Sequence, residues 1–213
     1  MRSRCYGRVS SGVVSDRSFV RFGGLAGILL AITSWTAVAV YYFVAKGGQD
    51  VVGLQVFQLL YGLTGFWALF GIVAVYWVTR SQGEAWSFFA TLVGLGASLF
   101  TITSSLWGVS VIRELITRPE LRTANASPTD PLNVMTYGLT GLWFLLANVL
   151  LYRARYPRLL VVLGFVAVAD LFAGFVAALS GDTQIVTYAG IVAGAVGGPL
   201  YWLWLGFLLR RRA

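Results

Sequence analysis

The sequence contains no histidine and one cysteine, Cys5. Without histidine, the chain cannot hold haem or zinc through imidazole and cannot form a Ser-His nucleophile pair. One thiol cannot form an internal disulfide, a two-cysteine metal pair or a redox pair. We therefore expect a protein without catalytic residues, without a metal site and without a bound cofactor.

Charged residues are also scarce, because they make up 11% of the 213 residues while 58% are hydrophobic. A soluble domain carries about 25% charged residues. The mean hydropathy of +0.77 points the same way. This composition excludes a water-soluble globular fold and predicts an all-α polytopic membrane protein.

Six long runs with few or no charges are each long enough to cross about 30 Å of hydrocarbon as a helix, which takes about 20 residues. They also exceed the roughly 10 residues that a strand of a membrane barrel needs. Residues 1–21 are expected to form a polar tail, residues 22–212 a six-helix membrane domain, and residues 117–130 the one sizeable loop. The six predicted spans are 22–45, 51–79, 85–112, 131–152, 159–179 and 183–209.

The basic residues are distributed unevenly between the two ends of these spans. Twelve of the 16 lie in the N-terminal tail, after the second and fourth spans, or at the C-terminus, and four lie at the other end. Basic residues concentrate on the cytoplasmic side of membrane proteins, so both termini are expected in the cytoplasm. The net charge of +8 then indicates contact with anionic lipid headgroups, and nucleic acid is not expected as a partner.

A short motif occurs twice. Residues 61–67 read YGLTGFW and residues 137–143 read YGLTGLW, so six of seven positions are identical at a distance of 76 residues. Trp202 occupies the corresponding position in the sixth span. The pattern predicts two or three parallel helical-hairpin repeats, in which Trp67, Trp143 and Trp202 serve as packing anchors.

Asp170 is an acidic residue deep inside a predicted span, where a charge costs about 3 kcal/mol on insertion scales. The residue is therefore expected to be protonated or to face polar partners, for which Ser98 and Thr101 lie at a similar depth. Two interpretations stay open: Asp170 binds a cation or carries a proton, or its carboxyl group joins two helices by a hydrogen bond. A role at a subunit interface is a third.

Small residues recur every four positions in the sixth span at Gly190, Gly194 and Gly198. This spacing favours close helix packing, either within one bundle or between two copies of the chain. Pro199 lacks a backbone N–H and is expected to kink the same span.

The segment 151–160 (LYRARYPRLL) and the ending 198–209 (GPLYWLWLGFLL) with its terminal arginines resemble bacterial six-span membrane proteins catalogued as domains of unknown function. The resemblance covers mainly residues 137–212 and implies a bacterial inner-membrane protein. We expect a structural or accessory membrane component that packs with lipid, with itself or with another membrane protein. The alternative is a small-solute or ion- or proton-coupled transporter or channel that uses Asp170.

Overall fold

The computed structural model describes residues 11–117 and 131–213, which form helices and no strands. Six helical spans are long and apolar enough to cross a membrane. The predicted all-α polytopic fold is therefore confirmed. Cys5 and the predicted loop lie outside the described residues, except that Thr117 ends a helix.

The helices follow the predicted runs closely at most ends. They are α1 (Ser11–Ala39), α2 (Val51–Thr79), α3 (Glu84–Thr117), α4 (Pro131–Arg153), α5 (Arg158–Ser180), α6 (Thr183–Ile191) and α7 (Gly198–Arg212). The sixth span consists of α6, the π-helical segment Val192–Gly197 and α7, while a second π-helical segment, Val40–Val44, extends α1.

Two helices are longer than the apolar runs that predict them. Helix α1 begins at Ser11, within the segment 1–21 that is expected to form a polar tail. Helix α3 likewise continues past residue 112 to Thr117. Loss of apolar character marks where the hydrocarbon ends, but a helix that leaves the bilayer keeps its own backbone hydrogen bonds.

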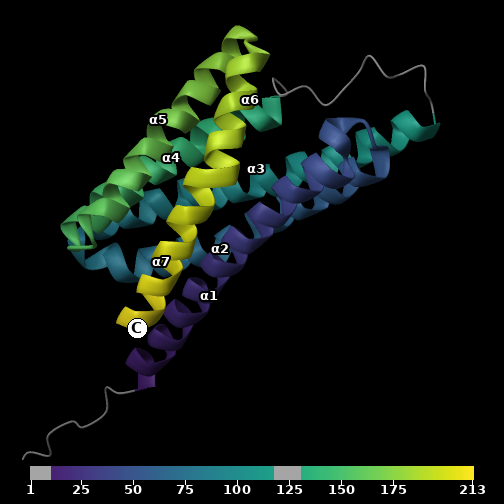
Figure 1. The fold of residues 1–213 in the computed structure, drawn as a ribbon. Coiled ribbons are helices and arrows are strands. Elements are labelled where there is room, and N and C mark those ends of the chain that lie inside the picture. Colours follow the sequence, from purple (N-terminus) through teal and green to yellow (C-terminus); the bar gives the residue numbers. More distant parts are fainter. Residues whose placement is uncertain (1–10, 118–130) are drawn as a thin grey trace, which may run out of the picture.

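The spans pack in chain order and close into a ring, because α7 returns to pack on α1. Figure 1 shows the start of α1 and the C-terminus at the same end of the bundle. We name this end the arginine-rich end, because nine exposed arginines of the span ends lie there. They are Arg17, Arg21, Arg80, Arg153, Arg155, Arg158, Arg210, Arg211 and Arg212.

At the opposite end the spans diverge. In Figure 1, α1, α2 and α3 extend to one side while the hairpin of α5 and α6 extends upward. Within the sixth span, helix α6 packs on α5, whereas the π-helical segment and α7 contact α1.

Two stacked tryptophans occupy the centre of the ring. The rings of Trp143 on α4 and Trp202 on α7 are nearly parallel, at 4° and with centroids 5.1 Å apart. Each ring lies against a glycine: Gly94 on α3 faces Trp143, and Gly71 on α2 faces Trp202. The glycines leave the space that the indoles fill, so four helices meet at this stack.

Helices α1 and α7 cross with their backbones in contact. A Cβ atom added at Gly206 would lie 2.5 Å from the carbonyl oxygen of Gly24, and one added at Gly24 would lie 2.7 Å from that of Gly206. Side chains of any size would separate the two helices here. This contact closes the ring near the arginine-rich end.

Candidate functional site

The polar groups that the sequence singles out do not form one site. Asp170 lies on α5 and is half-buried, and the backbone N–H of Ala193 in the π-helical segment donates to its carboxyl group. Its Oδ2 atom is buried and has no hydrogen-bond partner among the described residues. Asp170 therefore connects α5 to the irregular part of the sixth span and has one carboxyl oxygen unused.

Pro199 follows directly after the irregular part of the sixth span. A proline removes the N–H that would bond the carbonyl four residues earlier, which here belongs to Ala195. The indole Nε1–H of Trp35 on α1 donates to that carbonyl oxygen at 2.9 Å. Asp170 and Trp35 thus each bond a backbone group of the same irregular segment, from two different neighbouring helices.

Ser98 and Thr101, the expected partners of Asp170, lie in a different interface. Their hydroxyl groups donate to the carbonyl oxygens of Gly94 and Ala97 on their own helix, at 3.0 Å in both cases. A Cβ atom added at Gly65 on α2 would lie 3.0 Å from the Ser98 carbonyl oxygen, so this face of α3 packs on α2. The hydroxyl groups line no path to Asp170.

Tyr137 is the neighbour of Asp170 that sequence reasoning missed. Its ring lies against Gly174 on α5, and a Cβ atom added at Gly190 would lie 3.0 Å from its hydroxyl oxygen. Tyr137 is also near enough to Asp170 and to Tyr61 to interact with both electrostatically. Tyr61 and Tyr137 are the first residues of the repeated motif, so the repeat itself contained the signal.

The three glycines spaced by four in the sixth span make different contacts. Gly190 faces Tyr137, Gly194 has no atom of another residue near its side-chain position, and Gly198 lies against the carbonyl oxygen of Ala193 in its own span. The π-helical turn between them changes the helical spacing on which the predicted face depends. Within the chain, they therefore do not form one close-packed face.

The tryptophans at the repeated position also differ. Trp143 and Trp202 are 2% and 5% exposed, whereas Trp67 is half-buried at the edge of the core. The small residue four positions after each tryptophan is buried in every case: Gly71, Ala147 and Gly206. The repeated motif thus marks the inner face of α2, α4 and α7, with Trp67 outside the stack.

Polar groups are also buried near the arginine-rich end. Asn148 on α4 donates through Nδ2 to the Phe144 carbonyl oxygen at 2.7 Å and accepts from the hydroxyl of Tyr201 at 3.3 Å. Tyr156, in the turn between α4 and α5, is 5% exposed, and the guanidinium group of Arg212 lies over its ring. Burial raises the pKa of Tyr156, and the positive charge of Arg212 opposes this effect only in part.

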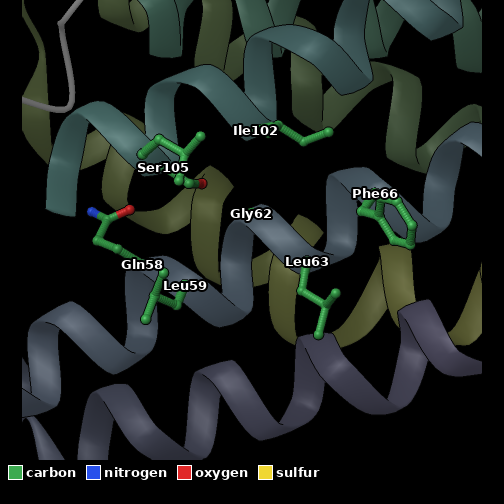
Figure 2. A pocket seen from close by; sticks show the side chains of 8 residues that line it. Gln58, Leu59, Gly62, Leu63, Phe66, Ile102 and Ser105 are labelled. Atoms are coloured by element: carbon green, nitrogen blue, oxygen red, sulfur yellow. The ribbon is translucent and has the colours of Figure 1, made fainter.

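A groove lies on the outer surface between α2 and α3 (Figure 2), with a volume of about 270 Å³. Gln58 and Ser105 lie toward one end and Phe66 toward the other. The Ser105 hydroxyl donates to the carbonyl oxygen of Thr101, so it offers no free donor. The other lining residues are Leu59, Gly62, Leu63, Ile102 and Leu106. The lining of this groove is mostly apolar, and its chemistry suits hydrocarbon.

The two copies of the repeated motif have different neighbours, and the groove lies beside the first copy. Gly62 on α2 faces the small side chain of Ser105, whereas the corresponding Gly138 on α4 is covered by the ring of Phe175 on α5. A bulky side chain therefore fills in one copy the space that is left open in the other.

Within residues 11–117 and 131–213, no group of three or more Cys, Asp or Glu side chains could hold a metal ion. Comparison with protein-family models, with curated proteins and with solved structures found no match. The function must therefore be argued from the geometry.

Proposed function

We propose that the protein is a non-catalytic structural or accessory component of a bacterial inner membrane, which packs with lipid, with itself or with another membrane protein. The observation that carries the proposal is the closed centre of the bundle. The Trp143–Trp202 stack, wedged against Gly71 and Gly94, fills the centre of the ring with aromatic rings. Polar and ionisable side chains mark the paths of ions and polar solutes through membranes, and the centre of this ring holds aromatic rings instead.

The contacts of Asp170 support a role in packing. Its carboxyl group accepts a hydrogen bond from the Ala193 N–H. In the same segment, the Ala195 carbonyl oxygen accepts a hydrogen bond from Trp35. Both bonds hold backbone groups that the break in the sixth span exposes. In hydrocarbon such groups have no water to bond, so each contact stabilises the break.

The proposed orientation places the arginine-rich end in the cytoplasm. Nine of the eleven basic residues within residues 11–117 and 131–213 lie at this end, which fits the rule for cytoplasmic loops. The high ratio of arginine to lysine and the resemblance to six-span bacterial proteins support the inner membrane of a bacterium.

The proposal is tested by reconstitution into liposomes and by native mass spectrometry from nanodiscs. We expect no flux of Na⁺, K⁺ or protons above that of empty liposomes, and a fixed oligomer or a bound membrane protein that Asp170→Asn does not change. Asparagine keeps an oxygen that can accept from Ala193. A saturable uptake that Asp170→Asn abolishes, with expression unchanged, would contradict the proposal.

A second candidate function is a cation- or proton-coupled carrier that uses Asp170. The buried, unpartnered Oδ2 atom beside a break in the last span favours it, because broken helices form the central sites of many transporters. The test is specific: uptake must be lost in Asp170→Asn and kept in Glu84→Gln, which changes an exposed carboxyl group at the start of α3.

A further inference from the structure

Four exposed arginines gather where α4 ends, α5 begins and α7 ends, and we name them the arginine cluster. They are Arg153, Arg155, Arg158 and Arg212. The guanidinium group of Arg212 lies over the ring of Tyr156 at 4.1 Å, and its Nη2 donates to the carbonyl oxygen of Arg155 at 3.2 Å. These contacts hold the end of α7 against the turn that joins α4 to α5.

The segments that carry the arginine cluster contain no acidic residue. Residues 153–158 and 198–213 contain no Asp or Glu, so the cluster has no carboxylate of its own segments beside it. Anions from outside the chain would reduce the repulsion among these like charges.

Arg155 has a backbone conformation that normally selects glycine. Its φ is 55°, and the bonds from Tyr156 N–H to the Leu151 carbonyl and from Arg155 N–H to the Tyr152 carbonyl close α4 in a Schellman motif. A side chain at this left-handed position is unfavourable compared with glycine. The backbone conformation alone would favour glycine at this position, yet the chain carries an arginine here.

The surface beside the cluster is apolar. Leu159, Val162 and Val166 on α5 are 66%, 55% and 56% exposed and share one helix face. The arginines lie at the ends of spans, so this face continues from the level of the headgroups into the hydrocarbon. A ligand with an anionic head and an apolar chain fits both the arginine cluster and the apolar face of α5, whereas a soluble phosphate fits the arginine cluster alone.

We propose that the arginine cluster and the adjoining face of α5 form a binding site for an anionic phospholipid. The phosphate contacts the arginines, and an acyl chain lies along Leu159, Val162 and Val166. This goes beyond the proposed function, since it holds for an accessory component and for a carrier alike. Basic clusters at membrane surfaces attract anionic headgroups, and each arginine strengthens the attraction.

The chain offers a matched pair of variants for the test. Arg155 and Lys46 are both basic, both exposed and both in the left-handed region, at φ 55° and 48°, but they lie at opposite ends of the bundle. Arg155→Gly and Lys46→Gly therefore remove the same charge and relieve the same kind of strain. In nanodiscs with phosphatidylglycerol in both leaflets, each end meets the same lipid.

The measurement is native mass spectrometry of the full chain released from phosphatidylcholine nanodiscs with and without phosphatidylglycerol. We expect the wild-type protein and Lys46→Gly to retain phosphatidylglycerol in preference to phosphatidylcholine. Arg155→Gly should reduce that preference by about fivefold, and Arg158→Gln, which leaves the left-handed position unchanged, by a similar factor.

Three outcomes would overturn the proposal. The first is an unchanged preference in Arg155→Gly and Arg158→Gln, and the second is an equal loss in Lys46→Gly. The third is displacement of the retained lipid by millimolar inorganic phosphate, which would assign the arginines to a soluble anion.

Discussion

The two halves of the bundle are held together differently. In the half toward the arginine-rich end, α1 and α7 touch backbone to backbone at Gly24 and Gly206. In the opposite half the spans diverge (Figure 1), and two of the six contain π-helical segments, Val40–Val44 and Val192–Gly197. Close packing without breaks gives stability, and regions with few contacts open at the lowest cost in free energy. We therefore expect the arginine-rich half to determine stability and the opposite half to allow movement.

The largest expected effect is that of Trp202→Ala. Removing a fully packed tryptophan costs about 3–5 kcal/mol of the free energy of unfolding, because the space beside Gly71 and Trp143 would stay empty. Reversible unfolding in mixed micelles measures the loss. Trp107→Ala is the control, since Trp107 is 55% exposed on α3, and it should change stability by less than about 0.5 kcal/mol. Equal losses would remove the distinction between the halves.

Gly206→Ala comes next and has a control in the same span. The added methyl group would meet the backbone of Gly24, and overpacking of this kind costs about 1–3 kcal/mol. Gly194→Ala adds the same atom where no other residue lies near, so it should leave stability unchanged or raise it by up to about 1 kcal/mol. The same unfolding assay compares the two variants. A loss in Gly194→Ala as large as that in Gly206→Ala would show that the opposite half is packed as closely.

The third prediction concerns pH. Burial raises the pKa of Tyr156 above its ordinary value of 10.0, so the folded state keeps the proton at a pH where the unfolded state loses it. The stability from this group is therefore fully present below pH 10.0 and falls as the pH rises toward the folded-state pKa. The slope is at most about 1.4 kcal/mol per pH unit. Unfolding of wild type and Tyr156→Phe between neutral and strongly alkaline pH measures it, and an identical slope in the two proteins would contradict the burial.

The smallest expected effect is that of Trp35→Phe in the opposite half. The variant loses the donor to the Ala195 carbonyl oxygen, and hydrogen bonds between membrane helices contribute about 0.6 kcal/mol on average. Trp86→Phe, at a tryptophan that is 59% exposed, is the control. Hydrogen exchange should rise in the Val192–Gly197 segment of Trp35→Phe and remain unchanged in the control. A loss above about 2 kcal/mol would exceed the range for such bonds and show that this contact governs the fold.

The spans were predictable because length and hydropathy are properties of the chain itself. Helices α2, α4 and α5 begin and end within one residue of the predicted runs. The start of α1 at Ser11 was not predictable in this way, because hydropathy marks the hydrocarbon boundary and the helix crosses it. Pro199 predicted a kink, and the structure has a π-helical segment directly before it, whose form depends on which neighbours bond the backbone groups.

The candidate site was less predictable than the fold. Asp170 was identified by the free-energy cost of placing a charged side chain in hydrocarbon. Its depth in the span did not identify its neighbours. Ser98 and Thr101 share its depth but lie between α2 and α3, while Tyr137 and Ala193 lie beside it. Depth gives the position of a residue along the membrane normal only. Its position in the membrane plane depends on which helices are adjacent.

The sequence by itself determined that this chain is a six-span helical membrane protein, because 58% hydrophobic composition and runs of membrane length allow no soluble fold. It also determined the uneven distribution of arginine, since charge positions along the chain fix which span ends carry them. Only the tertiary structure decided that the spans close into a ring, that Trp143 stacks on Trp202 and that Arg212 meets the α4–α5 turn. Those contacts join residues far apart in the chain, and they depend on helix rotation and helix neighbours, which hydropathy does not specify.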